Sequence, residues 1–307
     1  MDEDIRIIGK SPQIKDLLDF IKISSKTDDN ILILGHTGVG KELAAKNIHL
    51  QSHRRKCQFM KINCANLNEN LLESELFGHK KGAFTGAVYN KTGLIEEASH
   101  GTFFFDEIGD LPLFLQAKLL SLIEEKTIRR LGENKYKKIN VRFIFATNKN
   151  LYNLMKKRKF RKDLYYRIHE LSFCISPLKD RKEDIPLLVQ SILKKYKADK
   201  IIIKQEALCK LQQYSYPGNV RELESIIKRA VAYCKNNLIE EKHIQFTQKS
   251  NMSEKKRKRK TDYTLDEIIR ALKKNKGNIT KTAKELGMSR NNFYRMKKKM
   301  EEKITLD

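Results

Sequence analysis

An eight-residue segment near the N-terminus combines three glycines and a lysine at a spacing that suits phosphate binding. It follows the apolar run 31–34 and precedes the helix-like run 43–48. A strand, a glycine-rich loop and a helix in this order are typical of a phosphate-binding loop, in which backbone N–H groups and the helix N-terminus face the phosphates. Lys41 would add a point charge at the β- and γ-phosphates, so the segment predicts an ATP site. The segment consists of Gly35, His36, Thr37, Gly38, Val39, Gly40, Lys41 and Glu42.

Glu42 takes the position at which such loops usually carry a Ser or Thr that binds Mg²⁺. A carboxylate reaches the metal directly or through water, so Glu42 is a candidate Mg²⁺ ligand and the change does not exclude ATP. The alternative to a nucleotide site is a glycine-rich turn that opens an ordinary helix. Lys41 and the flanking segments favour the nucleotide site.

Two adjacent carboxylates, Asp106 and Glu107, follow the apolar run 101–105. A strand that ends in two acids is the Walker B arrangement, in which Asp106 would orient Mg²⁺ and Glu107 would polarise the attacking water. Two acids after a strand also occur at ordinary turns. The phosphate-binding loop earlier in the chain favours the catalytic interpretation.

Further along the chain, four polar residues are candidates for contact with ATP. Asn148 follows the apolar run 139–146, where α/β sheets bind ligands, and could sense the γ-phosphate; alternatively it caps the next helix. Arg161 and Arg167 would act as arginine fingers only in a ring, where one subunit reaches the ATP of the next. Arg221 falls in the first turn of a helix, against the helix dipole, which a nearby phosphate would explain.

A segment of small residues surrounds one aromatic side chain and one hydroxyl. With so few large side chains it cannot bury much surface, and we expect a mobile loop rather than regular structure. Exposed aromatic residues on loops tend to be contact points, so the loop predicts a partner-binding site. It consists of Gly82, Ala83, Phe84, Thr85, Gly86 and Ala87.

Residues 251–307 hold 18 Lys and Arg against 8 Asp and Glu, whereas the whole chain has a net charge of +25. This density is typical of nucleic-acid binding, although Lys is abundant throughout. Residues 279–295 read as helix, glycine-centred turn and helix, which predicts a helix-turn-helix on double-stranded DNA; the alternative is a Lys-rich helical hairpin. The candidate DNA contacts are Ser289, Arg290, Asn291, Asn292, Tyr294 and Arg295.

Several classes of protein are disfavoured by composition. No run reaches the roughly 18 apolar residues of a membrane span, and the acidic N-terminus does not read as a signal peptide. The five cysteines are odd in number and contain no Cys-x-x-Cys pair, which fits a reducing compartment. We therefore expect a cytoplasmic protein with no membrane partner.

The candidate residues require a parallel sheet between helices, because they follow one apolar run after another. The runs that predict its strands are 31–34, 58–63, 101–105 and 139–146. From about Pro177 the pattern becomes helical. We expect an α/β ATPase core over 1–176, a helical lid over 177–246, a basic linker over 247–262 and an all-α helix-turn-helix domain over 263–307.

Together these motifs resemble those of the bacterial enhancer-binding proteins, the AAA+ activators of sigma-54 RNA polymerase. The resemblance runs from about Ile8 to Lys299, and residues 82–87 match the family's GAFTGA loop at every position. The family also has Glu at the position of Glu42, whereas His36 replaces its usual Glu. The C-terminus resembles the family's Fis-type helix-turn-helix.

The resemblance implies an AAA+ P-loop ATPase that uses ATP and Mg²⁺ and contacts sigma-54 through residues 82–87. It implies that Asn63 holds the catalytic Glu107 between turnovers. It also implies that the two arginines of 161–167 are the fingers and that Arg221 is the sensor arginine near ATP.

The resemblance further implies a hexameric ring that hydrolyses ATP and moves Phe84 and Thr85 against sigma-54. The closed promoter complex of RNA polymerase would thereby be remodelled and its DNA opened, while the C-terminal domain tethers the ring at an upstream enhancer. Two alternatives are an AAA+ ATPase with another client and a DNA-binding repressor with a vestigial ATPase. The ATPase motifs begin almost at Met1, without the family's usual sensory domain, which fits either regulation in trans or a truncated form.

Overall fold

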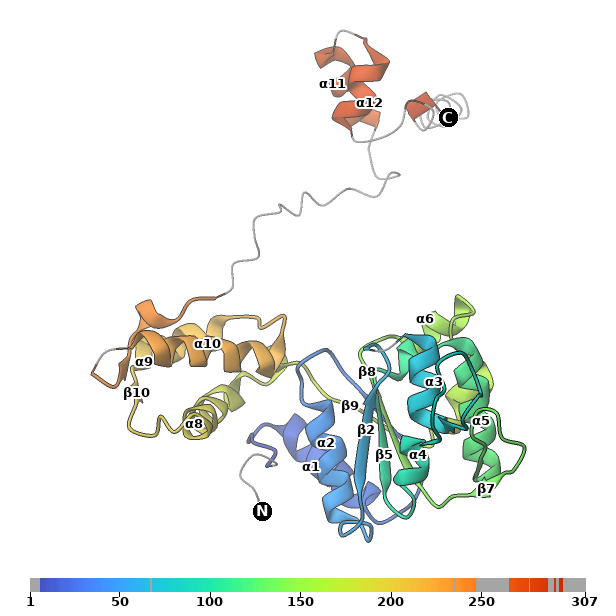
Figure 1. Cartoon of the computed structure of the whole chain (residues 1–307). Coiled ribbons are helices and arrows are strands. Elements are labelled where there is room, and N and C mark those ends of the chain that lie inside the picture. The colour runs from blue at the N-terminus through green and yellow to red at the C-terminus, as the bar shows by residue number, and fades with distance from the viewer. Residues whose placement is uncertain are drawn as a thin grey trace. The chain divides into compact units, whose positions relative to one another are not determined.

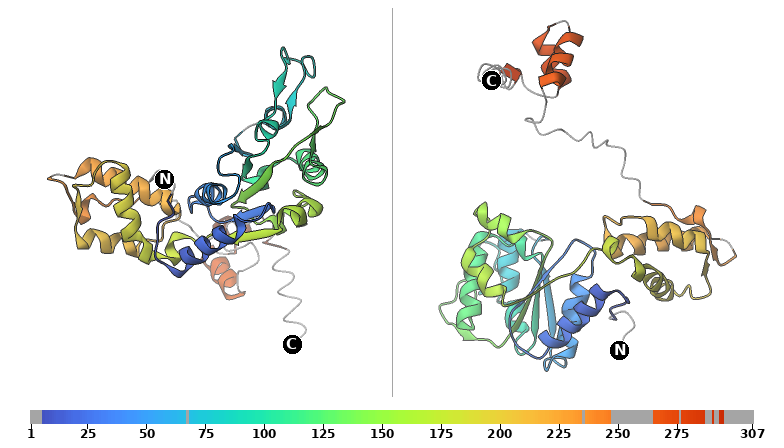
Figure 2. Two further views of the ribbon diagram at one scale, coloured as in Figure 1. Left: turned by 90° about the horizontal axis from the view of Figure 1, so that it is seen from below. Right: turned by 180° about the vertical axis from the view of Figure 1, so that it is seen from behind.

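The computed structural model forms two compact units, 1–245 and 246–307 (Figure 1). The first unit contains a parallel sheet with helices on both faces, followed by a helical subdomain (Figure 2). The basic linker expected over 247–262 lies outside the described residues. The structure describes residues 6–66, 68–234, 236–246, 265–275, 277–286, 290 and 293–294.

The central sheet has five parallel strands in the order β2-β5-β8-β1-β9. The four expected strands are present, but β8 begins at Arg142 rather than at Ile139, because the Ile139 N–H donates to the Lys126 carbonyl oxygen (2.9 Å) after the preceding helix. The fifth strand, β9, was not among the expected runs. The strands are β1 (Ile31–Leu34), β2 (Phe59–Asn63), β5 (Thr102–Asp106), β8 (Arg142–Thr147) and β9 (Leu171–Cys174).

The helices of the first unit begin and end close to the expected positions. Ser11 caps the first of them by accepting from the Ile14 N–H, with Pro12 in its first turn. The helices around the sheet are α1 (Pro12–Ser24), α2 (Lys41–Gln51), α3 (Glu69–Phe77), α4 (Leu94–Glu97), α5 (Leu113–Glu125), α6 (Leu151–Lys156) and α7 (Lys162–Ile168). The helical subdomain contains α8 (Ile185–Lys195), α9 (Gln205–Gln213) and α10 (Asn219–Tyr233).

Three pairs of two-residue strands complete the first unit. The pair β3–β4 encloses the loop of residues 82–87, and the pair β6–β7 lies between α5 and β8. The pairs are β3 (Gly78–His79) with β4 (Lys91–Thr92), β6 (Thr127–Ile128) with β7 (Lys137–Lys138), and β10 (Ile202–Ile203) with β11 (Leu238–Ile239).

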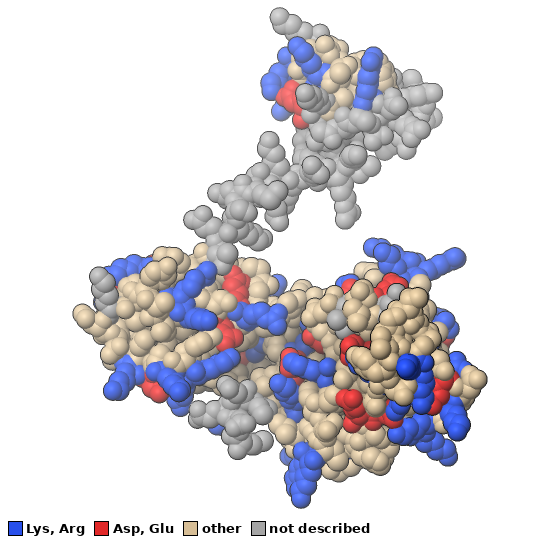
Figure 3. All heavy atoms as spheres, viewed as in Figure 1, with Lys and Arg blue, Asp and Glu red and all other residues tan. Residues whose placement is uncertain are grey.

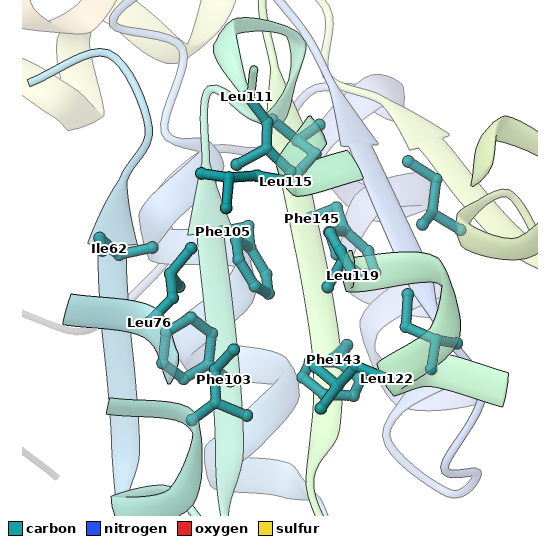
Figure 4. Close-up of a cluster of buried hydrophobic side chains, with 14 of the residues drawn as sticks. Ile62, Leu76, Phe103, Phe105, Leu111, Leu115, Leu119, Leu122, Phe143 and Phe145 are labelled. Atoms are coloured by element: carbon teal, nitrogen blue, oxygen red, sulfur yellow. The ribbon is translucent and has the colours of Figure 1, made fainter. Parts of the chain in front are cut away.

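Alternating side chains of β5 and β8 build the larger of the two cores. Phe103, Phe105, Phe143 and Phe145 are all buried on the face covered by α3 and α5 (Figure 4). Phe104 lies between two of them in sequence and packs on the opposite face, in the cluster with α1 and α2. This period of two is the geometry of a strand buried on both faces, and it fixes which way each strand faces.

The described part of the second unit contains α11 (Leu265–Lys274) and α12 (Ile279–Glu285). Ile268, Ala283 and Phe293 are buried together, with Leu286 packed against them, as the helix-turn-helix pattern predicts. Within the described residues of both units, no helix has the length and apolar composition that crossing a bilayer demands.

Phe105 is fully buried on β5, between β2 and β8, so we predict that Phe105→Ala lowers the free energy of unfolding by about 3–5 kcal/mol. Phe114 on α5 is 42% exposed, and Phe114→Ala is the matched control, with an expected loss below about 1 kcal/mol. Urea denaturation measures both values. Equal losses for the two variants would mean that the core is not centred on β5.

Candidate active site

The phosphate-binding loop lies between β1 and α2, as the sequence predicts. Gly38 has φ +80°, and a Cβ at this position would lie 2.3 Å from the Gly218 carbonyl oxygen, so the loop and the lid approach too closely for a side chain. Gly40 precedes α2 with φ +107°. Lys41 starts the helix, and its side chain is 7% exposed.

Lys41 and Glu107 form the central ion pair of the site. The Lys41 Nζ lies 3.3 Å from Glu107 Oε1 and donates to the Gly35 carbonyl oxygen at 3.0 Å. Glu107 has left-handed backbone angles (φ 53°, ψ 49°), which cost energy in a non-glycine residue. Its Oε2 accepts from the Asn148 N–H at 2.9 Å. The catalytic candidate is thus held between the phosphate loop and the end of β8.

Asn148 also contacts the phosphate loop directly. Its Nδ2 donates to Thr37 Oγ1 at 2.8 Å. The Asn148 backbone thus contacts Glu107, and the Asn148 side chain contacts Thr37. The cap of α6 is Asn150, whose side chain accepts from the Asn153 N–H. The alternative role of Asn148 as that cap is therefore wrong.

Asn63 lies beside the two carboxylates, at the end of β2. Its Nδ2 donates to Asp106 Oδ2 at 3.3 Å, whereas Glu107 is held by Lys41 and Asn148. The contact between Asn63 and Glu107 that the family resemblance implies is not formed in this structure. Register explains the difference: Asn63 pairs with Asp106 across β2 and β5, one residue before Glu107.

Burial raises the pKa of Asp106 above its ordinary value, and the negative charge of Glu107 raises it further. Glu42, on the first turn of α2, lies 2.6 Å from Lys61 Nζ and 3.1 Å from Lys46 Nζ. Both carboxylates are hard oxygen ligands of the kind that Mg²⁺ prefers. Among the described residues no group of three His, Cys, Asp or Glu forms a metal cluster.

The helical lid reaches the phosphate loop through the start of α10. Asn219 Nδ2 donates to the Thr37 carbonyl oxygen at 3.0 Å, and the Val220 N–H donates to the Gly38 carbonyl oxygen at 3.1 Å. Gly218 occupies the cap position of α10, and the buried Asn219 side chain joins Thr37 to Leu178, whose N–H donates to Asn219 Oδ1 at 2.9 Å. Arg221 follows directly, with its Cβ 3.1 Å from an ideal Cβ on Gly38, which places it beside the loop.

Arg161 directly precedes α7, Arg167 lies in its last turn, and each of these finger candidates has an acidic neighbour. Arg161 forms a two-point contact with Asp163, with Nη2 to Oδ2 at 2.7 Å. Arg167 Nη1 lies 3.5 Å from Glu170 Oε1. Both guanidinium groups are roughly two-fifths exposed, so they are available at the surface. The sequence alone did not indicate that Asp163 and Glu170 pair with these arginines.

Residues 82–87 form a tight loop between β3 and β4. The Gly82 N–H donates to the Ala87 carbonyl oxygen at 2.8 Å, and Phe84 is 45% exposed. The Phe84 ring packs edge-on against the buried His79, with centroids 5.0 Å apart. The loop thus presents an aromatic residue at the surface, as predicted.

A second loop, between β6 and β7, supports this one, as the two neighbouring hairpins in Figure 2 show. The Lys80 N–H donates to the Leu131 carbonyl oxygen at 2.9 Å, and the Leu131 N–H donates back to the Gly78 carbonyl oxygen at 3.0 Å. A Cβ on Gly132 would lie 2.8 Å from the Ala83 Cβ. This support joins segments far apart in the sequence, and Gly132 is its local signal.

Only part of the candidate DNA-binding set falls within the described residues. Arg290 is exposed and Tyr294 is 45% exposed, as DNA contacts require. Lys and Arg side chains are also scattered over the visible face of the first unit (Figure 3), so positive charge is not confined to the second unit. The candidates outside the described residues are Ser289, Asn291, Asn292 and Arg295.

The raised pKa of Asp106 gives a stability prediction. A carboxyl whose pKa is higher in the folded than in the unfolded protein costs stability once the pH exceeds the unfolded value. We therefore predict that Asp106→Asn, in the absence of ATP and Mg²⁺, raises the melting temperature at pH 7. The gain should shrink as the pH falls toward about 4, the ordinary pKa of Asp.

Asp163→Asn is the control of opposite sign, because its contact with Arg161 lowers the pKa of Asp163. This variant should gain nothing at pH 7. Thermal melts across the pH range measure both effects. An Asp106→Asn protein that melts at or below the original temperature at pH 7 would contradict the raised pKa of Asp106.

Three family models match the chain in succession. The sigma-54 interaction domain matches residues 7–174, the AAA+ ATPase lid domain matches 179–261, and the bacterial regulatory protein, Fis family, matches 266–298. These matches agree with the phosphate loop, the lid and the helical cluster described above.

Known relatives extend over most of this chain. The DNA-binding transcriptional activator HyfR of Escherichia coli (strain K12) is 48% identical over 235 residues, which cover 75% of this chain and 35% of HyfR. The regulatory protein AtoC of the same organism is 41% identical over 300 residues, covering 92% of this chain and 65% of AtoC. The crystal structure of NtrX from Brucella abortus in complex with ATP matches with a TM-score of 0.73 and 29% identity, covering 96% of this chain and 69% of that one.

The chain thus spans between 35% and 69% of the length of these relatives. Its first family model covers more than half of the 307 residues. The fold is that of an AAA+ domain with its lid, followed by a Fis-type helix-turn-helix segment. The chain belongs to the sigma-54 interaction domain family.

Proposed function

We propose that this protein is a sigma-54-dependent transcriptional activator that hydrolyses ATP in a ring, most simply a hexamer, in the cytoplasm. Its output is the loop 82–87, which contacts sigma-54 and remodels the closed complex of RNA polymerase until the promoter DNA opens. The observation that carries the proposal is this loop, which presents Phe84 at the surface on a hairpin of a protein that also has a phosphate loop. Its C-terminal domain binds double-stranded enhancer DNA.

The geometry of the site supports a role for each candidate residue in hydrolysis. The Lys41 ammonium group lies between the phosphate loop and Glu107. When ATP binds, it would leave Glu107 and pair with the phosphates. Glu107, released from that ion pair, would act as the base for the attacking water. Asn148 contacts both Glu107 and Thr37 of the phosphate loop. The position of Glu107 would therefore depend on whether ATP is bound in that loop. Asn63 donates to Asp106 and would hold that carboxylate in place; between turnovers it would turn to Glu107, once Glu107 has left Lys41.

Asp106, and Glu42 as a further candidate, would hold Mg²⁺, which neutralises charge on the phosphates when bound. Arg221 on the lid would sense the nucleotide of its own subunit. Arg161 just before α7 and Arg167 in its last turn are partly exposed, and they would reach the nucleotide of the neighbouring subunit. A AAA+ ATPase with another client would use the same residues but would not depend on Thr85, and a vestigial ATPase would depend on none of them.

The trans action of the fingers is tested by mixing subunits. We predict that Arg161→Ala and Arg167→Ala each lose ATPase activity when pure, because the transition-state charge is no longer neutralised. Mixed with Lys41→Ala subunits, either variant should recover activity, since an intact nucleotide site can then meet an intact finger. Steady-state phosphate release measures the rate. Mixed rings that stay inactive, with mixing verified by mass spectrometry, would count against these finger positions.

Thr85 separates the proposal from its rivals. A surface hydroxyl usually contributes within about 0.5 kcal/mol to stability, so we predict that Thr85→Ala folds, assembles and hydrolyses ATP normally. It should nevertheless fail to bind sigma-54 in a transition-state-like nucleotide complex and fail to open the promoter.

One preparation of this variant should be used for ATPase rate, ring formation and open-complex formation. Promoter opening by Thr85→Ala at the original rate would contradict the proposed coupling of ATP hydrolysis to sigma-54. Loss of ATPase activity would place the loop within the ring rather than at its output. Thr127→Ala on β6, in the neighbouring hairpin, is the matched control, because its partly buried hydroxyl donates to Glu125 at the end of α5.

A further inference from the structure

Asn30 makes three contacts with a segment that lies about 140 residues further along the chain. Its side chain Nδ2 donates to the Arg167 carbonyl oxygen at 3.1 Å, and its backbone N–H donates to Glu170 Oε2 at 2.8 Å. Its own carbonyl oxygen accepts from the Leu171 N–H at 3.1 Å. Asn30 is buried, with 4% of its surface exposed. None of these contacts belongs to the candidate nucleotide site.

These contacts hold the backbone at Arg167 and in the residues that follow it. Arg167 lies in the last turn of α7, and Leu171 is the first residue of β9, which pairs with β1 from Ile31 onward. Short segments between a helix and a strand are usually mobile. Here the segment is tied to the residue that directly precedes β1, a strand inside the sheet between β8 and β9.

We propose that Asn30 and Glu170 are positioning residues for Arg167: they fix the backbone from which Arg167 reaches the ATP of the neighbouring subunit. The inference rests on the proposed role of Arg167 as a finger in a ring. In this role neither Asn30 nor Glu170 contacts the nucleotide. A misplacement of about 1 Å is enough to reduce the effect of a catalytic group severely, so a fixed backbone matters.

The hydrogen bonds rather than the ion pair carry this role. Arg167 Nη1 lies 3.5 Å from Glu170 Oε1, and both side chains are partly exposed, so the pair contributes little energy. The second carboxylate oxygen of Glu170 makes the shorter contact, at 2.8 Å with the Asn30 N–H. A Gln at position 170 retains an oxygen that accepts this bond, whereas an Ala does not.

Mixing of subunits separates finger positioning from general damage. Pure Asn30→Ala and Glu170→Ala proteins should lose roughly ten-fold in ATPase rate, because the finger is misplaced. Both retain an intact nucleotide site. Mixed with Lys41→Ala, which supplies an intact Arg167, they should recover activity. Mixed with Arg167→Ala, which supplies no finger, they should not recover.

Two further variants serve as controls. Glu170→Gln should keep most of the original rate, because its amide oxygen accepts from the Asn30 N–H. Asn68→Ala removes a comparable contact elsewhere, since the Asn68 side chain caps α3 by accepting from the Leu71 N–H at 2.9 Å. It should hydrolyse ATP at the original rate. Thermal melts compare the stability of Asn30→Ala and Asn68→Ala.

Three results would overturn the inference. The first is an original ATPase rate in both Asn30→Ala and Glu170→Ala while Arg167→Ala is inactive, which would leave the proposed function intact. The second is equal recovery, or equal failure, with Lys41→Ala and with Arg167→Ala partners. The third is an active Arg167→Ala protein, which would remove the proposed finger itself and with it the need to position it.

Discussion

Parallel pairing of the central strands in register is the constraint on which the candidate active site depends. Ile31 pairs with Ile144, Phe105 with Phe145 and Asn63 with Asp106. Because the strands run in the same direction, the polar segments that follow them meet at one edge of the sheet. A slip of one residue in β5 would exchange Phe104 with its buried neighbours on the other face. The packing of the phenylalanine core and the meeting of the catalytic candidates therefore have the same cause.

The charged side chains at this edge of the sheet lower the free energy of unfolding. Lys41 is almost fully buried, and burial raises the pKa of Asp106 above its ordinary value. Glu107 adds a left-handed backbone conformation. Lys41 offsets part of this cost by contacting both Glu107 and the Gly35 carbonyl oxygen. Strain and buried charge concentrated in one place are typical of a site kept for chemistry rather than for stability.

Local patterns in the sequence predicted the motifs and most of the elements. The glycine spacing of the phosphate loop, the carboxylates after β5 and the small residues of 82–87 each depend only on neighbours in sequence. The contacts that were missed join distant segments: Asn219 with Thr37, Gly132 with Ala83, and Asn63 with Asp106 rather than Glu107. Their partners are set by strand register and by the docking of the lid. No local pattern encodes either of these.

The same register supports the proposal that the finger acts on a neighbouring subunit. The Arg167 backbone is tied to Asn30 at the start of β1, whereas the phosphate loop begins with Gly35 at the end of that strand. A strand rises about 3.3 Å per residue, so the five residue steps from Asn30 to Gly35 place roughly 16 Å between these two points. The chain therefore displays its phosphate loop at one edge of the sheet and Arg167 near the other. A subunit built in this way is suited to complete its neighbour's site rather than its own, and closure of such contacts into a ring gives every subunit both a nucleotide and a finger.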